Sequence, residues 1–178
     1  MLKFQHNLKM LISKEEIQEK IAQYAKEINE KFKDEKEISV IGVMNGGVFF
    51  FTDFLRKIDL PIKMDIISAS SYSGTSSTRE LIFHKKVTKP IIEGKHVIII
   101  EDILDTGLTM EKIYEYLLDL KPKSLQITVL ATKPMCHPDF KYEYNALFEV
   151  PDKFIVGYGM ETDDLYRQLE DIYVIEED

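Results

Sequence analysis

A short acidic and hydroxyl-rich segment contains the residues of this chain that are best suited to chemistry. Glu101, Asp102 and Asp105 stand close together, and the sequence Thr-Gly-Leu-Thr follows at 106–109. Carboxylates can accept hydrogen bonds from sugar hydroxyls, bind a metal ion or accept a proton. Threonine hydroxyls and the free N–H groups of a glycine-containing turn are donors for a phosphate. The segment therefore predicts a site for a phosphorylated ligand that carries hydroxyl groups.

The apolar residues on both sides of this segment predict a β-strand followed by a helix. Residues 97–100 (Val-Ile-Ile-Ile) are typical of a strand that is buried on both faces, and we expect this strand to end at the acidic pair. The residues that recur behind the threonines at the spacing of one helix face are Met110, Ile113, Tyr114, Leu117 and Leu118. We expect a phosphate at the N-terminus of this helix, where free N–H groups and the positive end of the dipole meet.

Two other interpretations of the segment are open. In a purely structural one, Thr106 or Thr109 is the N-cap of the helix and the acids are solvated loop residues. The tripeptide Asp-Thr-Gly at 105–107 is also found in aspartic proteases, but these need two such aspartates, and the chain contains the tripeptide once. The nucleotide motifs G-x-x-x-x-G-K-[ST] and G-x-G-x-x-G are both absent. The strand-loop-helix context favours the phosphate site.

Length and composition set limits on the class of protein. The 178 residues suit one domain, and 44% hydrophobic with 30% charged residues is typical of a globular protein. A net charge of −8 disfavours nonspecific binding to nucleic acid. Cys136 is the single cysteine, so no intrachain disulfide can form, and the N-terminus lacks the apolar core of a secretory signal. We expect a cytoplasmic protein without a membrane span.

The rest of the chain alternates strands with helices. A capping box at Ser13 and Glu16 begins a helix, and a second, buried helix starts at Val48. Strands are expected at 38–43, 63–69, 81–87, 126–131, 146–150, 155–159 and 172–175. This order predicts the α/β class, with a three-layer, mostly parallel twisted sheet. Ligands bind at the carboxyl ends of the strands in such sheets, and the residues that fall at or near these ends are Gly46, Asp102, Lys133 and Gly157.

These motifs resemble those of a known family. The segment VIIIEDILDTGLT at 97–109 is similar to the phosphoribosyl-diphosphate-binding signature of type I phosphoribosyltransferases. The segments VMNGG at 43–47, SSYSG at 70–74, a lysine at 133 and VPDKFIVGYG at 150–159 follow the order seen in hypoxanthine-guanine phosphoribosyltransferases. The resemblance runs from about residue 10 to the C-terminus. It implies one domain over 1–178, with a small hood built from the N-terminal segment and about 134–178.

The resemblance also implies an activity. Members of this family transfer ribose 5-phosphate from 5-phosphoribosyl 1-diphosphate to hypoxanthine or guanine, with Mg²⁺ as cofactor, and release IMP or GMP and diphosphate. It further implies a homodimer or homotetramer. The alternative is a regulator that keeps the fold but binds RNA or DNA, which would need a basic face that the acidic composition disfavours.

The resemblance assigns a role to each matched residue. Asp105 is the general base that faces purine N7. The implied purine-binding residues are Lys133, which donates to O6, Phe154, which stacks on the ring, Ile155 and Glu161. The implied phosphoribosyl-diphosphate-binding residues are Asn45, Gly46, Ser71, Tyr72, Glu101, Asp102, Thr106, Gly107, Leu108, Thr109 and Arg167. The implied metal ligands are Glu101, Asp102 and Glu161.

Two positions depart from the family pattern. Asn45 stands where many relatives have a basic residue, and Glu161 stands where they usually have an aspartate beside Mg²⁺. Mg²⁺ demands near-octahedral geometry, so the extra methylene of a glutamate can change the geometry of the metal site.

Several of the assigned residues also have structural interpretations. Lys133 is then an exposed lysine at a strand end, Phe154 a core aromatic residue and Arg167 half of an ion pair on a helix surface. Gly46 is then only a residue that allows the chain to turn. The histidines His84 and His137 have no partner spacing for a metal or for nucleophilic catalysis and are interpreted as structural.

Overall fold

A six-stranded sheet forms the centre of the computed structural model, which describes residues 6–72 and 80–176 and only the backbone of Ser71, Tyr72 and Glu80. The strand order is β4-β3-β2-β5-β6-β7. The parallel strands are β2 (Ile38–Met44), β3 (Ile62–Tyr72), β5 (His96–Leu104), β6 (Ser124–Thr132) and β7 (Tyr144–Glu149). The edge strand β4 (Glu80–Lys85) runs antiparallel to β3. The predicted α/β class and mostly parallel sheet are confirmed.

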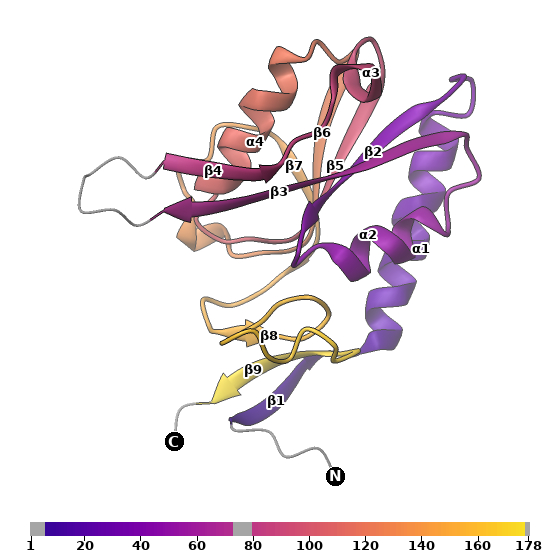
Figure 1. The fold of residues 1–178 in the computed structure, drawn as a ribbon. Helices are drawn as coiled ribbons and strands as arrows, with labels where there is room; N and C mark the ends of the chain where they lie inside the picture. The colour runs from indigo at the N-terminus through magenta and orange to yellow at the C-terminus, as the bar shows by residue number, and fades with distance from the viewer. Residues whose placement is uncertain (1–5, 73–79, 177–178) are drawn as a thin grey trace.

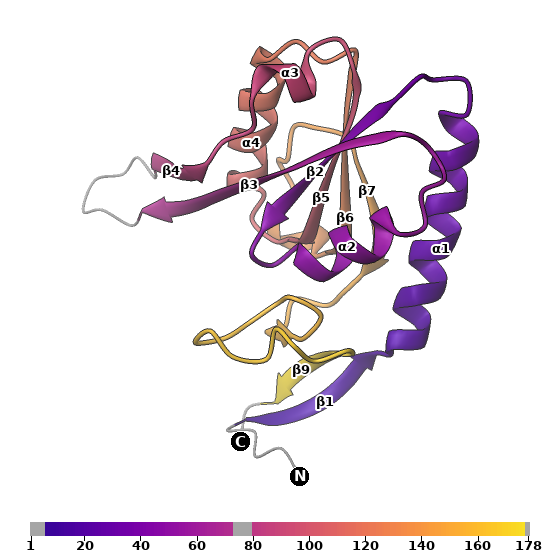
Figure 2. The same cartoon turned by 45° about the vertical axis from the view of Figure 1, so that its right-hand side comes forward.

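Helices cover both faces of this sheet, and Figure 2 shows the sheet between them. The helices α1 (Lys14–Lys31) and α2 (Val48–Leu55) lie on one face, and α3 (Lys89–Ile92) and α4 (Leu108–Asp119) lie on the other. Strand β5 serves both cores, because Ile98 and Ile100 pack in the α1/α2 core while Val97 and Ile99 pack in the α3/α4 core. The prediction of a strand buried on both faces is confirmed.

The predicted capping box begins α1. The Ser13 side chain accepts from the Glu16 N–H, and the Glu16 carboxylate accepts from the Ser13 N–H at 2.9 Å. The apolar stripe behind it is buried and consists of Ile17, Ile21, Tyr24 and Ile28. The equivalent stripe of α4 is buried at Met110, Ile113 and Leu117, but Leu118 is 50% exposed, so its predicted place in the core was wrong.

A second, three-stranded sheet has the order β1-β9-β8 and is antiparallel. It joins the two ends of the described chain, because β1 (Asn7–Ile12) pairs with β9 (Ile172–Glu176), which also pairs with β8 (Ile155–Val156). Figure 1 shows it below the carboxyl ends of the central strands, and we call β1, β8, β9 and the loop 157–171 the hood. No pattern in the sequence predicted β1.

Two predicted strand ends near the site were wrong. Strand β5 does not end at the acidic pair but continues to Leu104, because its pairing with β6 continues through Glu101↔Val129 and Ile103↔Ala131. Strand β8 does not reach residue 159, because Gly157, Tyr158 and Gly159 have φ values of +100°, +49° and +102°. Residues 89–92 form the short helix α3, which the sequence patterns did not predict. In the residues that the structure describes, no helix is long and apolar enough to cross a membrane.

Candidate active site

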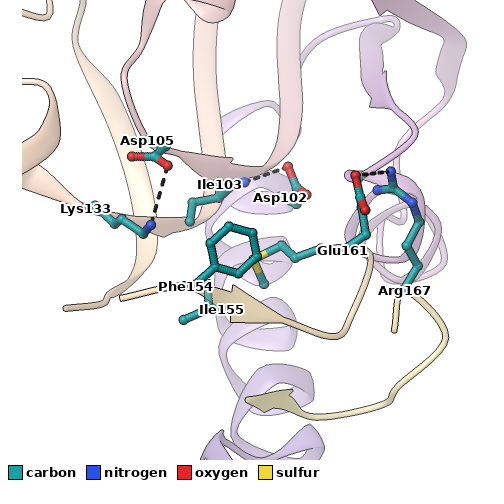
Figure 3. A pocket seen from close by; sticks show the side chains of 10 residues that line it. Asp102, Ile103, Asp105, Lys133, Phe154, Ile155, Glu161 and Arg167 are labelled. Atoms are coloured by element: carbon teal, nitrogen blue, oxygen red, sulfur yellow. Dashed lines mark hydrogen bonds and ion pairs between the residues drawn. The ribbon is translucent and has the colours of Figure 1, made fainter. Parts of the chain in front are cut away.

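A cavity of about 290 Å³ lies between the carboxyl edge of the large sheet and the hood. The large sheet and its loops contribute Gly46, Asp102, Ile103, Asp105 and Lys133. The hood and the segment leading into it contribute Phe154, Ile155, Met160, Glu161 and Arg167. Figure 3 shows these side chains around one space, so the fold brings together residues that are far apart in the sequence.

Lys133 and Asp105 form a pair on the sheet side of the cavity. The Lys133 Nζ lies 3.4 Å from the Asp105 Oδ2. Lys133 directly follows β6, and its backbone N–H donates to the Leu104 carbonyl at the end of β5, which fixes the ends of the two strands together. Lys133 is only 8% exposed, so the interpretation as an exposed strand-end lysine was wrong. The pair presents a cationic donor beside an anionic acceptor, whose side chain is half exposed to the cavity.

The acidic pair Glu101-Asp102 lies within β5. Asp102 is buried, its Oδ1 accepts from the Ile103 N–H at 2.8 Å, and its Oδ2 faces Gly46. A Cβ added to Gly46 would lie 2.0 Å from that Oδ2, so this approach requires glycine and Gly46 is more than a turn residue. The Glu101 side chain accepts from the Asp102 N–H and is not among the residues that line the cavity. Burial, followed by the charge on Asp102, raises the pKa of Glu101 well above its usual range.

The turn before α4 contains backbone N–H groups that have no acceptor in the described part of the chain. Its N-cap is Gly107 at φ +77°, and no side chain caps the helix, so the interpretation of Thr106 or Thr109 as the N-cap was wrong. Within the described part of the chain, the N–H groups of residues 106–109 have no acceptor. Thr106 and Leu108 are exposed and Thr109 is half-buried. A Cβ on Gly107 would meet the Phe140 ring at 2.6 Å, so glycine is required both by φ and by packing. An anion beside Asp105 can use these free donors.

Phe154 forms the hood side of the cavity. Its side chain is 57% exposed, so the interpretation as a core aromatic residue was wrong. The backbone is anchored, because the Phe154 carbonyl accepts from the Ile175 N–H of β9. Ile155 and Met160 are buried beside it. In Figure 3 the Phe154 ring lies between Lys133 on one side and Glu161 on the other, where it can contact a flat ligand.

Glu161 and Arg167 form an ion pair on the hood loop. The Arg167 Nη2 lies 3.3 Å from the Glu161 Oε1, and the Arg167 Nη1 donates to the Gly159 carbonyl at 2.7 Å. The Glu161 Oε2 also accepts from the Asp164 N–H. This segment contains no helix, so the predicted ion pair of Arg167 exists, but on a loop and not on a helix surface. Arg167 is partly exposed at the cavity, and its planar guanidinium can still bind an oxyanion.

Asn45 is not among the described residues that line the cavity. Asn45 is exposed and follows β2, where the Met44–Asn45 peptide bond is cis. Ser71 and Tyr72 end β3, and their side chains lie outside what the structure describes. His137 is buried, with its Nε2 2.9 Å from the Thr132 hydroxyl, and His84 contacts Ser70, which fits structural roles for both.

The predicted metal ligands are not gathered into one cluster. Among residues 6–72 and 80–176, no group of three His, Cys, Asp or Glu side chains is arranged to hold a metal ion. Asp102 and Glu161 both line the cavity, whereas Glu101 does not. Mg²⁺ usually keeps several waters and binds through one or two carboxylates plus substrate phosphates. The residues present therefore fit a Mg²⁺ ion that a phosphorylated substrate helps to hold.

Two cavity residues were missed by sequence analysis. Ile103 lies beside Asp102 on β5, and its place after the acidic pair was an available signal. Met160 lies on the hood loop, which has no periodicity from which its direction could be predicted.

Comparisons with known proteins agree with this architecture. Residues 9–163 match the phosphoribosyl transferase domain family. A hypoxanthine-guanine phosphoribosyltransferase of Aquifex aeolicus is 38% identical over 171 residues, which are 96% of each chain. A hypoxanthine-guanine-xanthine phosphoribosyltransferase of Tritrichomonas foetus is 38% identical over 95% of this chain and 92% of its own. The solved hypoxanthine phosphoribosyltransferase of Trypanosoma cruzi, in complex with the product IMP, has a TM-score of 0.87 at 33% identity and covers 99% of this chain and 98% of that chain.

Proposed function

Because the chain belongs to the phosphoribosyl transferase family, and its hypoxanthine-guanine relatives match it along nearly its whole length, we propose that it is a purine-salvage enzyme. It transfers ribose 5-phosphate from 5-phosphoribosyl 1-diphosphate to hypoxanthine or guanine and releases IMP or GMP with diphosphate. The relatives are transferases, which favours this activity over the nucleic-acid-binding alternative.

The observation that carries the proposal is the Lys133–Asp105 pair opposite Phe154. A 6-oxopurine presents O6, an acceptor, next to N7 on one edge. When N7 carries a proton, a protein that binds this edge must offer a donor to O6 and, beside it, an acceptor to the N7 proton. The Lys133 Nζ and the Asp105 Oδ2, which lie 3.4 Å apart, are such a donor and acceptor. The exposed face of Phe154 supplies a stacking surface for the ring.

Asp105 is the general base in this scheme. As purine N9 bonds to the anomeric carbon and the bond from that carbon to diphosphate breaks, the N7 proton passes to the Asp105 carboxylate. Asp105 is suited to this because its side chain is half exposed and contacts a buried lysine, which keeps the carboxylate near the purine edge. The carboxylate accepts the proton while the buried ammonium of Lys133 remains hydrogen-bonded to O6.

The sugar and its 5′-phosphate lie along β5 and the start of α4. Breaking an anomeric C–O bond develops oxocarbenium character, which nearby negative charge stabilises. Asp102, which lines the cavity, accepts hydrogen bonds from the ribose hydroxyls, whereas Glu101, to which the resemblance gives the same role, does not line the cavity. The free N–H groups and hydroxyls of residues 106–109 hold the phosphate.

Diphosphate is expected between Arg167 and the loop at Asn45-Gly46. Asp102 and Glu161, which both line the cavity, would hold a Mg²⁺ ion on this side, and the ion would supply charge neutralisation for the leaving group. Arg167 binds a diphosphate oxygen, and Gly46 allows the loop to lie against Asp102. The resemblance to the family also implies that Ser71 and Tyr72 belong to a lid that excludes water.

A steady-state assay of nucleotide formation tests the proposal. Hypoxanthine, guanine, xanthine, adenine and uracil are each supplied with 5-phosphoribosyl 1-diphosphate, with Mg²⁺ and after exhaustive chelation. We expect turnover of hypoxanthine and guanine that depends on the metal. A preference for adenine or uracil, or full turnover after chelation, would contradict the proposed reaction.

The assembly and the location of the enzyme belong to the same proposal. We expect one domain that forms a homodimer or homotetramer in the cytoplasm. Light scattering on the purified chain measures the mass of the particle, and a monomer at assay concentration would contradict the predicted assembly.

A further inference from the structure

One carboxylate outside the cavity lies in an unusual set of contacts. Asp53 on α2 accepts from the Tyr158 hydroxyl at 2.5 Å and from the Gln18 amide at 2.5 Å through the same oxygen, Oδ2. The Gln18 amide also lies 3.4 Å from the Tyr158 hydroxyl. Tyr158 is 6% exposed, and Asp53 and Gln18 are half-buried. The cluster joins α1 and α2 of the large sheet to the hood loop.

The hydroxyl of Tyr158 is held in its donor form. Burial, followed by the hydrogen bond to Asp53, raises the pKa of Tyr158 far above its usual range. The backbone of this residue has φ +49°, a conformation that residues other than glycine populate sparsely. The side-chain contact with Asp53 therefore helps to hold the loop in a conformation that the backbone alone would not favour.

Gly159, which follows Tyr158, contacts both groups that are expected to bind diphosphate, namely Arg167 and the loop at Gly46. Gly159 donates its N–H to the Arg167 carbonyl at 2.9 Å and accepts from the Arg167 Nη1 at 2.7 Å. A Cβ on Gly159 would lie 1.9 Å from the Gly46 carbonyl oxygen, so the two backbones are in direct contact. A displacement of Tyr158 is therefore transmitted to Arg167 and to Gly46.

We propose that Asp53 is a positioning residue for the diphosphate side of the site. Through the Tyr158 hydroxyl it places Gly159, and Gly159 in turn sets the position of the Arg167 guanidinium and the loop at Gly46. Asp53 itself touches neither substrate. The inference rests on the proposed function, because that function assigns Arg167 and Gly46 to diphosphate.

The purine side of the cavity is held by other contacts. Lys133 is anchored by its N–H on the Leu104 carbonyl, and Phe154 by its carbonyl on the Ile175 N–H. Neither contact includes Asp53 or Tyr158. Loss of the Asp53–Tyr158 hydrogen bond should therefore weaken the binding of diphosphate groups while leaving the purine contacts in place.

The variants Tyr158→Phe and Asp53→Asn test the inference with little change in volume. We expect the KM for 5-phosphoribosyl 1-diphosphate to rise about tenfold in each, the scale for one lost hydrogen bond to a charged group. In the reverse reaction, the KM for diphosphate should rise by a similar factor. The KM for hypoxanthine should stay within about twofold of the wild-type value, and isothermal titration with Mg²⁺ and diphosphate measures the binding loss directly.

Tyr24→Phe is the matched control. The Tyr24 hydroxyl is also buried between two side chains, 2.5 Å from the Thr128 hydroxyl and 2.7 Å from the Gln126 amide, but it lies on α1 away from the cavity. We expect both Tyr24→Phe and Tyr158→Phe to lose thermal stability, but only Tyr24→Phe to keep the wild-type KM for both substrates. A merely structural role for Tyr158 would give the two variants the same kinetic profile.

The double variant tests whether Asp53 acts through Tyr158. Asp53→Asn in a Tyr158→Phe background should raise the KM for 5-phosphoribosyl 1-diphosphate no further, because Tyr158→Phe has already removed the hydrogen bond through which Asp53 acts. An additive rise, an equal rise in both substrate KM values, or unchanged binding of diphosphate would overturn the inference. If the wild type itself fails to form IMP, the proposed function fails instead; active wild type with unchanged variants removes only the role of Asp53.

Discussion

The two sides of the cavity differ in how their side chains are held. On the sheet side, Lys133 is 8% exposed, and the strands on which Lys133 and Asp102 depend are joined by a continuous parallel ladder. On the hood side, Phe154 is 57% exposed, and the loop that follows it is held by a few hydrogen bonds and by glycines at positive φ. In the proposed mechanism, the groups that are aligned for proton transfer lie on the sheet side, and the groups that stack on the purine or bind diphosphate and Mg²⁺ lie mostly on the hood side.

The largest effect on the sheet side of the cavity is expected from a substitution of Asp105. Asp105→Asn keeps the size of the side chain but removes the base, so kcat should fall about 10²- to 10⁴-fold, the usual scale for general acid–base catalysis. The KM for 5-phosphoribosyl 1-diphosphate should change much less. Steady-state kinetics at saturating substrates measure this, and a variant that keeps most of its kcat would remove the general-base assignment.

Lys133→Ala is expected to have the next largest effect. Lysine can only donate, so it matches O6 of hypoxanthine and opposes the amino group of adenine. We expect kcat/KM for hypoxanthine to fall about 10²-fold or more, because a hydrogen bond to a buried charged group is lost, while the low activity with adenine changes little. The ratio of kcat/KM for the two bases gives the result, with Lys153→Ala, beyond the cavity lining, as a control. An unchanged ratio would show that another residue sets specificity.

Phe154→Ala tests the looser side of the site. Stacking of a base on an aromatic ring contributes about 1–3 kcal/mol, so the KM for hypoxanthine should rise by about five- to a hundredfold. Because the Phe154 side chain is 57% exposed, the melting temperature should stay near that of the wild type. Phe154→Tyr, which keeps the ring, is the control. A large fall in melting temperature would mean that Phe154 supports the core after all.

Glu161→Asp is expected to have the smallest effect. The Glu161–Arg167 pair is partly exposed on both sides, and pairs of this kind contribute about 0–1 kcal/mol. Shortening the side chain weakens this pair and also brings the usual family residue to the Mg²⁺ side. Activity should therefore stay within about fivefold of the wild type. The Mg²⁺ concentration needed for half-maximal turnover is the measurement, and loss of activity without unfolding would show that the longer side chain is specifically required.

Features that depend on neighbouring residues could be predicted from the sequence. The capping box and stripe of α1, the doubly buried β5 and the acidic segment before a threonine-containing turn all arise within a few residues of chain, where periodicity and hydrogen bonding are local. The resemblance to phosphoribosyltransferases rests on the same short motifs. For this reason the α/β class was correctly expected, and most residues that line the cavity were singled out from the sequence.

Features that depend on distant residues required the tertiary structure. Lys133 is buried only because the ends of β5 and β6 meet, and the hood loop lies against the sheet side of the site only because the Gly159 backbone packs directly on the Gly46 carbonyl. Strand β1 forms by pairing with β9 from the other end of the chain, and no local sequence pattern predicts that pairing. The contact of Asp53 with Tyr158 joins residues 105 positions apart. Burial and side-chain pairing are set by packing between elements, whereas the elements themselves are encoded by local spacing.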